Sequence, residues 1–182
     1  MLAATHPFTP QLHALGDTRD GRRLALVPMT PEAATTLALR IAAIGPWARY
    51  NFSPDAMQAS LRVSGDGAIR YQISIDAVPA GVVIIRSPWL AGPYLQMLAI
   101  LPQFQNSGSG AAILDWYEAT ARSARLRNVW LCVSGFNHDA QRFYGRHGYA
   151  LAGRLAGLIR DGDDELLMRK SLAGPIIGST PA

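Results

Sequence analysis

The stretch that decides the fold runs from Leu98 to Thr120 and reads LAILPQFQNSGSGAAILDWYEAT. It begins with an apolar segment that predicts a buried strand, and Pro102 ends this strand because proline lacks the N–H that a ladder hydrogen bond needs. A polar loop with two glycines, Gln103 to Gly110, follows, and an amphipathic helix begins directly after it. Such a strand, loop and helix N-terminus form an anion site, because free backbone N–H groups and the positive end of the helix dipole converge there.

The segments that follow complete a parallel strand–helix–strand unit. Apolar residues of the helix share one face: Ala111, Leu114, Tyr117, Ala121 and Ala124. Charged residues take the opposite side: Asp115, Glu118, Arg122 and Arg125. The apolar segment 128–133 predicts the next strand. A helical crossover of this length joins parallel strands.

The other periodic segments predict an α/β chain without a second domain. Strands are expected over 22–27, 68–76, 82–86, 94–101, 149–153 and 165–169. Helices are expected from Thr30 to about Ile44, from Ser53 to about Val63, and from Asn137 to Gly148. Residues 1–20 lack periodicity and are interpreted as a loose arm, and residues 173–182 as a tail. The domain is therefore placed at 21–172.

Composition excludes several classes of protein. The apolar fraction is 49% over 182 residues, which suits one domain with a core. No apolar run has the length of a membrane span, and no signal peptide is visible, so we expect a cytoplasmic protein. Lys170 is the only lysine among 17 basic residues, which hints at a bacterial origin. The net charge of +4 is spread along the chain, which argues against nucleic-acid binding.

Three kinds of phosphate-binding loop place glycines between a strand and a helix, as this chain does at Gln103 to Gly110. A P-loop ends in Gly-Lys-Ser or Gly-Lys-Thr, and the chain has neither. A dinucleotide-binding loop needs a third glycine where this chain has Ile113. The remaining pattern is Gln-x-x-Gly-x-Gly, formed by Gln105, Gly108 and Gly110.

This pattern resembles the coenzyme A pyrophosphate loop of the GNAT superfamily of N-acetyltransferases, in which Gln or Arg precedes Gly-x-Gly or Gly-x-Ala. The strand that ends at Pro102 is similar to the family strand before that loop. A second segment is also similar: Asn137, Ala140, the pair Phe143 and Tyr144, and the turn Gly148-Tyr149. The resemblance covers about 94–149 and implies a GNAT-type mixed α/β (α+β) domain. Its central sheet would be mostly antiparallel, with about six or seven strands, a parallel βαβ unit at the cofactor site and about four flanking helices.

The resemblance implies that the donor is acetyl-CoA. Its diphosphate would accept hydrogen bonds from the loop: Gln105, Asn106, Ser107, Gly108, Ser109, Gly110 and Ala111. The backbone of Leu98, Ala99 and Ile100 would bind the pantetheine arm, where two parallel strands splay apart. A tight strand-to-helix turn is the alternative interpretation of the glycines.

The second segment implies a catalytic role for Tyr144. The matching family tyrosine lies near the thioester sulfur and protonates the departing thiolate, which a phenol O–H can do. A core aromatic residue is the alternative. Asn137 either contacts the cofactor or caps its helix, and the sequence leaves both open.

The proton acceptor is less defined. Many family members have a glutamate where this chain has Tyr94, with Gln96 two residues later, so these two are the candidates for a water-mediated proton path. His138 and His147 are interpreted as helix-surface or packing residues. The segment 163–165 is interpreted as a solvated turn, one of whose carboxylates could reach a cationic substrate.

The acceptor site is expected beside the loop between the first two helices. Its residues Trp47, Arg49 and Tyr50, with Phe52, either form a wall of that site or pack under the loop. The expected reaction is direct attack of a primary amine on acetyl-CoA in a ternary complex, without a metal. Cys132 is not expected to act as a nucleophile, because buried thiols are usually inert.

Two rivals keep the same binding loop: a non-catalytic acyl-CoA-binding module, and an enzyme with another acyl donor. The expected partners are acetyl-CoA and the acceptor amine, and the chain would be a monomer or homodimer.

Overall fold

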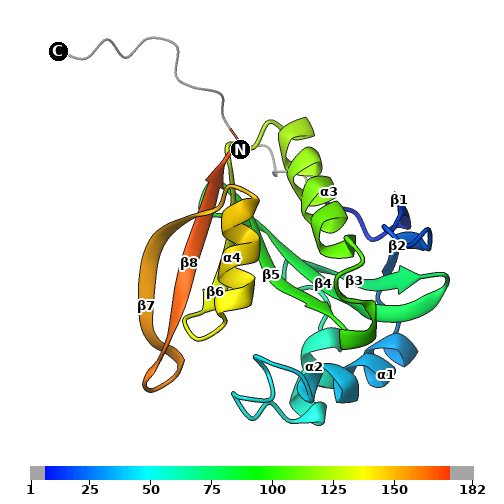
Figure 1. Cartoon of the computed structure of the whole chain (residues 1–182), viewed down its shortest axis with the longest axis horizontal. Helices are drawn as coiled ribbons and strands as arrows, with labels where there is room; N and C mark the ends of the chain where they lie inside the picture. The colour runs from blue at the N-terminus through cyan, green and yellow to red at the C-terminus, as the bar shows by residue number, and fades with distance from the viewer. Residues whose placement is uncertain (1–6, 173–182) are drawn as a thin grey trace.

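A mixed eight-stranded sheet forms the centre of the molecule (Figure 1). The structure is a computed structural model that describes residues 7–172. The strands are β1 (His13–Asp17), β2 (Arg23–Pro28), β3 (Ala68–Ile75), β4 (Val78–Trp89), β5 (Gly92–Ile100), β6 (Asn128–Ser134), β7 (Ala150–Arg160) and β8 (Asp163–Ser171). Their spatial order is β1-β2-β3-β4-β5-β6-β8-β7, and β5 with β6 is the parallel pair among these strands. The mixed, mostly antiparallel sheet is therefore confirmed, with one strand more than expected.

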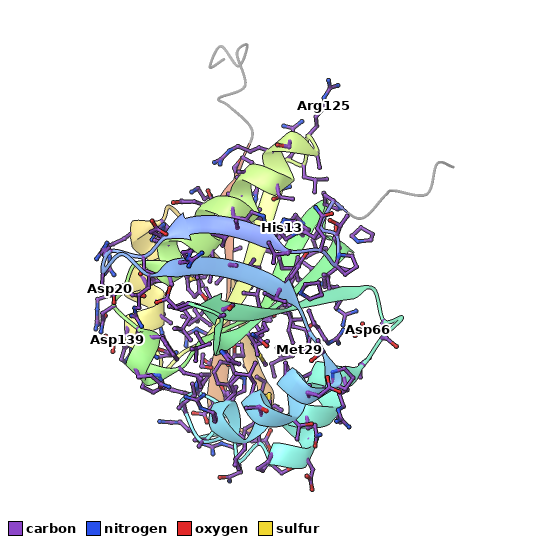
Figure 2. The ribbon with its side chains drawn as sticks, turned by 90° about the vertical axis from the view of Figure 1, so that its right-hand side faces the viewer. His13, Asp20, Met29, Asp66, Arg125 and Asp139 are labelled. Atoms are coloured by element: carbon purple, nitrogen blue, oxygen red, sulfur yellow. The ribbon has the colours of Figure 1, made fainter. Side chains whose placement is uncertain are left out.

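Within the described residues, four α-helices flank the sheet: α1 (Pro31–Ala42), α2 (Pro54–Arg62), α3 (Ser109–Ser123) and α4 (His138–Arg146). A 3-10 turn, η1 (Pro102–Phe104), links β5 to the loop before α3. In Figures 1 and 2, α3 lies on one side of the strands β1–β5, and α1 with α2 lies on the other. The caps follow the sequence, because Thr30, Ser53 and Asn137 each accept a hydrogen bond from the backbone N–H three residues later.

The expectation of a loose arm over residues 1–20 is wrong for its second half. Residues 13–17 form β1, which pairs antiparallel with β2. The register shifts between Ala14 and Gly16, so a bulge interrupts the alternation that would mark this strand in the sequence. Residues 1–6 and the expected tail 173–182 lie outside the described residues.

The helix face predicted for α3 is wrong at two positions. Glu118 is only 3% exposed, while Ala124 is exposed. The Glu118 carboxylate accepts from Lys170 Nζ at 2.6 Å and pairs with Arg122 at 3.4 Å. A buried carboxylate is tolerated here because cations on α3 and β8 compensate its charge.

The parallel pair opens soon after it forms. Only Tyr94 and Leu95 of β5 pair with β6, opposite Trp130 and Leu131. Beyond this point β6 continues alongside β8, while β5 continues alongside β4, and the two halves of the sheet diverge (Figure 1). The V-shaped opening leaves one edge of β5 without a strand partner among the described residues.

Candidate functional site

The open edge of β5 lies where the sequence predicts the donor arm. Leu98, Ala99 and Ile100 pair with β4 on their other edge. Ile84 faces Met97 and Ile85 faces Leu95, so Gln96 is the extra residue of a β-bulge. A bulge bends its strand and redirects backbone groups, which helps to separate β5 from β6. Backbone N–H and C=O groups on this edge are available to a ligand.

Hydrogen bonds from its own side chains hold the loop after β5 in place. Gln105 Nε2 donates to the carbonyl of Ile100 at 2.8 Å, which ties the loop to the end of the strand. Ser107 Oγ is buried and donates to the carbonyl of Phe104 at 2.8 Å, with Ser109 Oγ 3.1 Å away. Asn106 and Gly108 adopt left-handed backbone conformations, with φ of 61° and 85°. Alternating backbone handedness before a helix turns successive N–H groups toward one concavity, an arrangement that binds anions.

The two glycines of the loop have different surroundings. Gly108 has a positive φ, and a Cβ there would lie 3.1 Å from Cγ of Arg19. A Cβ on Gly110 would lie 3.3 Å from the ring of Phe143 and 3.5 Å from Ile100 Cδ1. Gly108 therefore provides the turn at the start of α3, and Gly110 permits close packing of α3 against α4 and β5.

Arg19 is a residue that the sequence reasoning missed. Its backbone N–H donates to the carbonyl of Ser107 at 2.8 Å, and its side chain lies against Gly108. It is exposed, and no carboxylate of the described residues forms an ion pair with it. The β1–β2 turn thus brings a cation to the loop from a part of the chain without sequence periodicity.

A cavity of about 310 Å³ lies at the opening between β5 and β6. It is lined by residues from the α1–α2 loop, α2, β5, β6, α4, β7 and β8: Pro46, Trp47, Tyr50, Phe52, Met57, Ser60, Tyr94, Leu95, Gln96, Met97, Leu98, Cys132, Val133, Ser134, Asn137, Ala140, Tyr144, Ile159 and Glu165. The cavity therefore brings together predicted residues from the donor, acid, base and acceptor sets.

Tyr144 lies on α4, and its ring packs edge-on against Phe143 and Tyr149. Its hydroxyl makes no hydrogen bond to another described residue, although the side chain is only 8% exposed. Burial raises the pKa of Tyr144 above that of an ordinary phenol, so the group carries its proton at neutral pH. Asn137 Oδ1 accepts from the Ala140 N–H at 3.1 Å, so Asn137 caps α4 and also lines the cavity.

The two candidates for a proton path differ in their surroundings. Tyr94 stacks on Trp89, and it lines the cavity together with Cys132. Burial is the main cause that raises the pKa of both Tyr94 and Cys132. Gln96 Oε1 accepts from Arg86 Nε at 3.3 Å, which directs this amide toward a surface arginine.

The acidic segment 163–165 is the start of β8 and not a solvated turn. Asp163 and Glu165 are only 7% and 4% exposed. Both project to the same side of β8, because side chains two residues apart share a face of a strand. Glu165 Oε1 accepts from the Tyr50 hydroxyl at 2.6 Å, and Asp163 Oδ1 accepts from Arg49 at 2.9 Å. These contacts join the α1–α2 loop to β8.

The loop residues predicted for the acceptor separate into two groups. Trp47 and Tyr50 line the cavity, together with Phe52. Arg49 instead lies outside the set of lining residues, with its guanidinium over the Phe136 ring at 4.0 Å and paired with Asp163. Desolvation and the hydrogen bond to Glu165 raise the pKa of Tyr50 to about 12.

The second hollow and the histidines lie outside this cavity. A larger hollow of about 610 Å³ lies between the β2–α1 junction, the end of α2 and β3, and its two arginines are Arg62 and Arg70. His138 is exposed and His147 packs against Phe143. Within residues 7–172 no group of three His, Cys, Asp or Glu side chains is placed to hold a metal. None of the helices described combines the length and hydrophobicity of a bilayer span.

Comparison with known proteins gives a family for this fold and site. The sequence model of the acetyltransferase (GNAT) family matches residues 37–149, which is more than half of the chain. Two relatives, named as uncharacterized N-acetyltransferases of Mycobacterium bovis and Mycobacterium tuberculosis, are each 37% identical over 59 residues. That match covers 32% of this chain and 38% of each relative.

Solved structures share the fold. A Desulfovibrio desulfuricans protein described as a GNAT acetyltransferase superposes with a TM-score of 0.66 at 22% identity, covering 82% of this chain and 99% of its own. The ribosomal-protein-S18-alanine N-acetyltransferase of Escherichia coli gives 0.64 at 20% identity, covering 85% and 99%. The fold, the loop before α3 and the family match agree: this chain belongs to the GNAT family of acetyltransferases.

Proposed function

We propose that this acetyltransferase moves an acetyl group from acetyl-CoA to a primary amine by direct attack in a ternary complex. The observation that carries the proposal is that Tyr144 lines the same cavity as Gln96 and Leu98 on the open edge of β5. A proton donor and a row of unpaired backbone groups are the two requirements for holding a thioester and releasing its sulfur.

The loop fits the diphosphate of the donor. The first N–H groups of α3, at Ser109 to Ala111, have no partner within the helix, and the left-handed residues before them point further N–H groups the same way. Arg19 adds a positive charge beside Gly108. In this proposal Gln105 positions the loop through its bond to Ile100.

Acetyl-CoA supplies a thioester whose carbonyl carbon accepts a nucleophile and whose sulfur leaves. The N–H groups at Leu98 to Ile100 would polarise the carbonyl, and Tyr144 would give its proton to the sulfur. Asn137 holds the start of α4 and thereby the position of Tyr144. Holding both reactants in one cavity supplies much of the rate enhancement through orientation.

The proposal extends to the setting of the enzyme. An arginine-rich composition with one lysine supports a bacterial enzyme, and the single cysteine suits a reducing cytoplasm. In this proposal the enzyme works as a monomer or homodimer, without nucleic acid, membrane or metal.

The test is a thiol-release assay with acetyl-CoA and a panel of amines, with mass spectrometry of the product. The expected result is release of free coenzyme A only when an amine is present, together with an N-acetylated product. Release that requires a longer acyl donor, or binding of acetyl-CoA without release for every amine, would contradict the proposal.

A further inference from the structure

Glu165 is the one charged side chain among the described residues that line the cavity. It is 4% exposed, so its carboxylate is largely removed from solvent. A carboxylate in such a place is costly unless a cation or several hydrogen-bond donors compensate its charge. The identity of those partners therefore decides whether Glu165 is structural.

The protein itself does not neutralise Glu165. Its hydrogen bond comes from the Tyr50 hydroxyl, a neutral donor, at 2.6 Å. Nearby arginines are already engaged, since Arg49 and Arg160 pair with Asp163 at 2.9 and 2.5 Å, and Arg154 pairs with Asp164 at 2.7 Å. No ion pair within residues 7–172 includes Glu165. Glu118 provides the contrast, because Lys170 and Arg122 neutralise that buried carboxylate.

Glu165 shares the cavity with Tyr94, Cys132 and Tyr144. Its negative charge contributes, after burial, to the raised pKa of both Tyr94 and Cys132. Tyr144 lines the same cavity. A cation held by Glu165 would therefore lie in the space that Tyr144 faces.

The rest of the wall is mostly apolar. Trp47 and Phe52 come from the α1–α2 loop, Met57 from α2, Met97 from β5 and Ile159 from β7. A cavity of about 310 Å³ has room for a small acceptor beside the acyl end of the donor. An anionic group beside the nitrogen would meet the unpaired Glu165 charge and would be repelled.

We propose that Glu165 binds the ammonium group of the acceptor and accepts its proton, and that the acceptor is a small primary amine with an apolar or aromatic body and no anionic group beside the nitrogen. This inference rests on the proposed function. Glu165 would then supply a carboxylate from β8 to a cavity in which β5 places none.

The proton balance is complete with these groups. The ammonium loses one proton to Glu165, and the neutral amine forms an N–C bond to the acetyl carbon as the C–S bond breaks. As the amide forms, the nitrogen loses its second proton, which passes to the Tyr144 phenolate and replaces the proton that Tyr144 gives to the sulfur. Tyr144 gives a proton to the sulfur and regains one, so a free thiol, an amide and one proton released from Glu165 are the net products.

The test compares Glu165→Gln with the control Asp164→Asn. Glutamine keeps the shape and the acceptor for Tyr50 but removes the charge. Asp164 is the neighbouring carboxylate on the other face of β8, paired with the exposed Arg154. The readouts are acetyl-CoA affinity by calorimetry, kcat and KM with 2-phenylethylamine, and binding of this amine in the presence of coenzyme A.

We expect Glu165→Gln to lower kcat/KM for 2-phenylethylamine about 100-fold and to weaken amine binding at least tenfold, because a buried charge partner is lost. Acetyl-CoA affinity should stay within twofold of wild type, and Asp164→Asn should match wild type. The wild type should prefer 2-phenylethylamine to L-phenylalanine and to spermidine by about 100-fold in kcat/KM.

Wild-type kcat/KM in Glu165→Gln would overturn the role of the carboxylate, and equal use of L-phenylalanine would overturn the substrate class. Either result leaves the acetyl-CoA reaction intact. If the wild type fails to bind acetyl-CoA, the proposed function and this inference both fall, so the two failures are distinguishable.

Discussion

At the scale of single residues, two buried glutamates show how partners decide a role. Glu118 and Glu165 are 3% and 4% exposed, so both side chains are buried away from solvent. Lys170 and Arg122 neutralise Glu118, which therefore links α3 to β8. Glu165 has the neutral Tyr50 hydroxyl and a cavity beside it. The uncompensated charge is the feature that points to a ligand.

This contrast predicts opposite effects of neutral substitution on stability. Glu165→Gln should raise the free energy of unfolding by about 1 kcal/mol, because it removes an unpaired buried charge while keeping the bond to Tyr50. Glu118→Gln should lower the free energy of unfolding by about 3 kcal/mol, because Lys170 would be left without its carboxylate.

Urea denaturation at neutral pH checks both variants. A loss of stability in Glu165→Gln comparable to that in Glu118→Gln would mean that Glu165 has a structural partner.

At the scale of elements, the proposed donor site lies where α3, the end of β5 and the β1–β2 turn meet. The loop 103–110 is contiguous, so its chemistry could be predicted from the sequence. Arg19 could not be found this way, because β1 is short, bulged and distant in the chain from Gly108. Two features that arise from strand pairing then affect the proposed binding of acetyl-CoA. One is the positive charge that the β1–β2 turn places at Arg19, and the other is the close approach of β4 to β5.

The charge at Arg19 predicts an effect on the donor. Arg19→Glu should weaken acetyl-CoA binding about tenfold, because it replaces a cation beside the diphosphate loop with an anion. Arg125→Glu is the matched control, since Figure 2 shows Arg125 at the far end of α3 from the turn that carries Asp20. Calorimetric titration at two salt concentrations measures the acetyl-CoA affinity of both variants. Equal affinities of the two variants for acetyl-CoA would mean that the diphosphate binds away from Arg19.

The approach of β4 to β5 predicts an effect on stability. A Cβ on Gly81 would lie 2.0 Å from the backbone carbonyl oxygen of Ala99, so Gly81→Ala must push the two strands apart. We expect a loss of about 3 kcal/mol in the free energy of unfolding and weaker acetyl-CoA binding. Gly153→Ala is the control, because its Cβ would meet nothing within 4 Å. Equal stability of the two variants would contradict the strand geometry.

At the scale of the whole molecule, the sequence predicts local structure better than assembly. The helix caps and the parallel unit each lie within one short segment, and these elements form as expected. The cavity is different, because Tyr50, Tyr94, Cys132, Tyr144 and Glu165 come from five elements or loops. The turn Asp161-Gly162-Asp163 is acidic, so the sequence predicts that this segment is exposed to solvent. Alternation along a strand that begins at Asp163 would have placed Glu165 on its inner face.

The fold also depends on an ion cluster at the turn before β3. Asp66 accepts from Arg70 at 2.8 and 2.9 Å and from Arg86 at 3.1 Å, and Figure 2 shows it at the rim of the sheet. These bonds, first those from Arg70, hold the pKa of Asp66 well below its usual range. A lowered carboxyl pKa gives stability that is present above about pH 4 and is lost as the pH falls.

Asp66→Asn should therefore destabilise the protein at pH 7 by about 2 kcal/mol and should flatten the loss of stability below about pH 4. Urea denaturation across pH 2.5 to 7 measures both curves. Parallel curves for wild type and variant would show that another carboxyl group carries the acid sensitivity.

The central claim is that acetyl transfer takes place in the cavity between β5 and β6, with Tyr144 as proton donor. The most direct measurement is thiol release by Tyr144→Phe at saturating acetyl-CoA and amine, with acetyl-CoA affinity measured alongside. The variant removes one hydroxyl, which makes no hydrogen bond to the described part of the chain. We predict a kcat lower by about 100-fold with acetyl-CoA affinity unchanged; a full wild-type kcat would contradict the account.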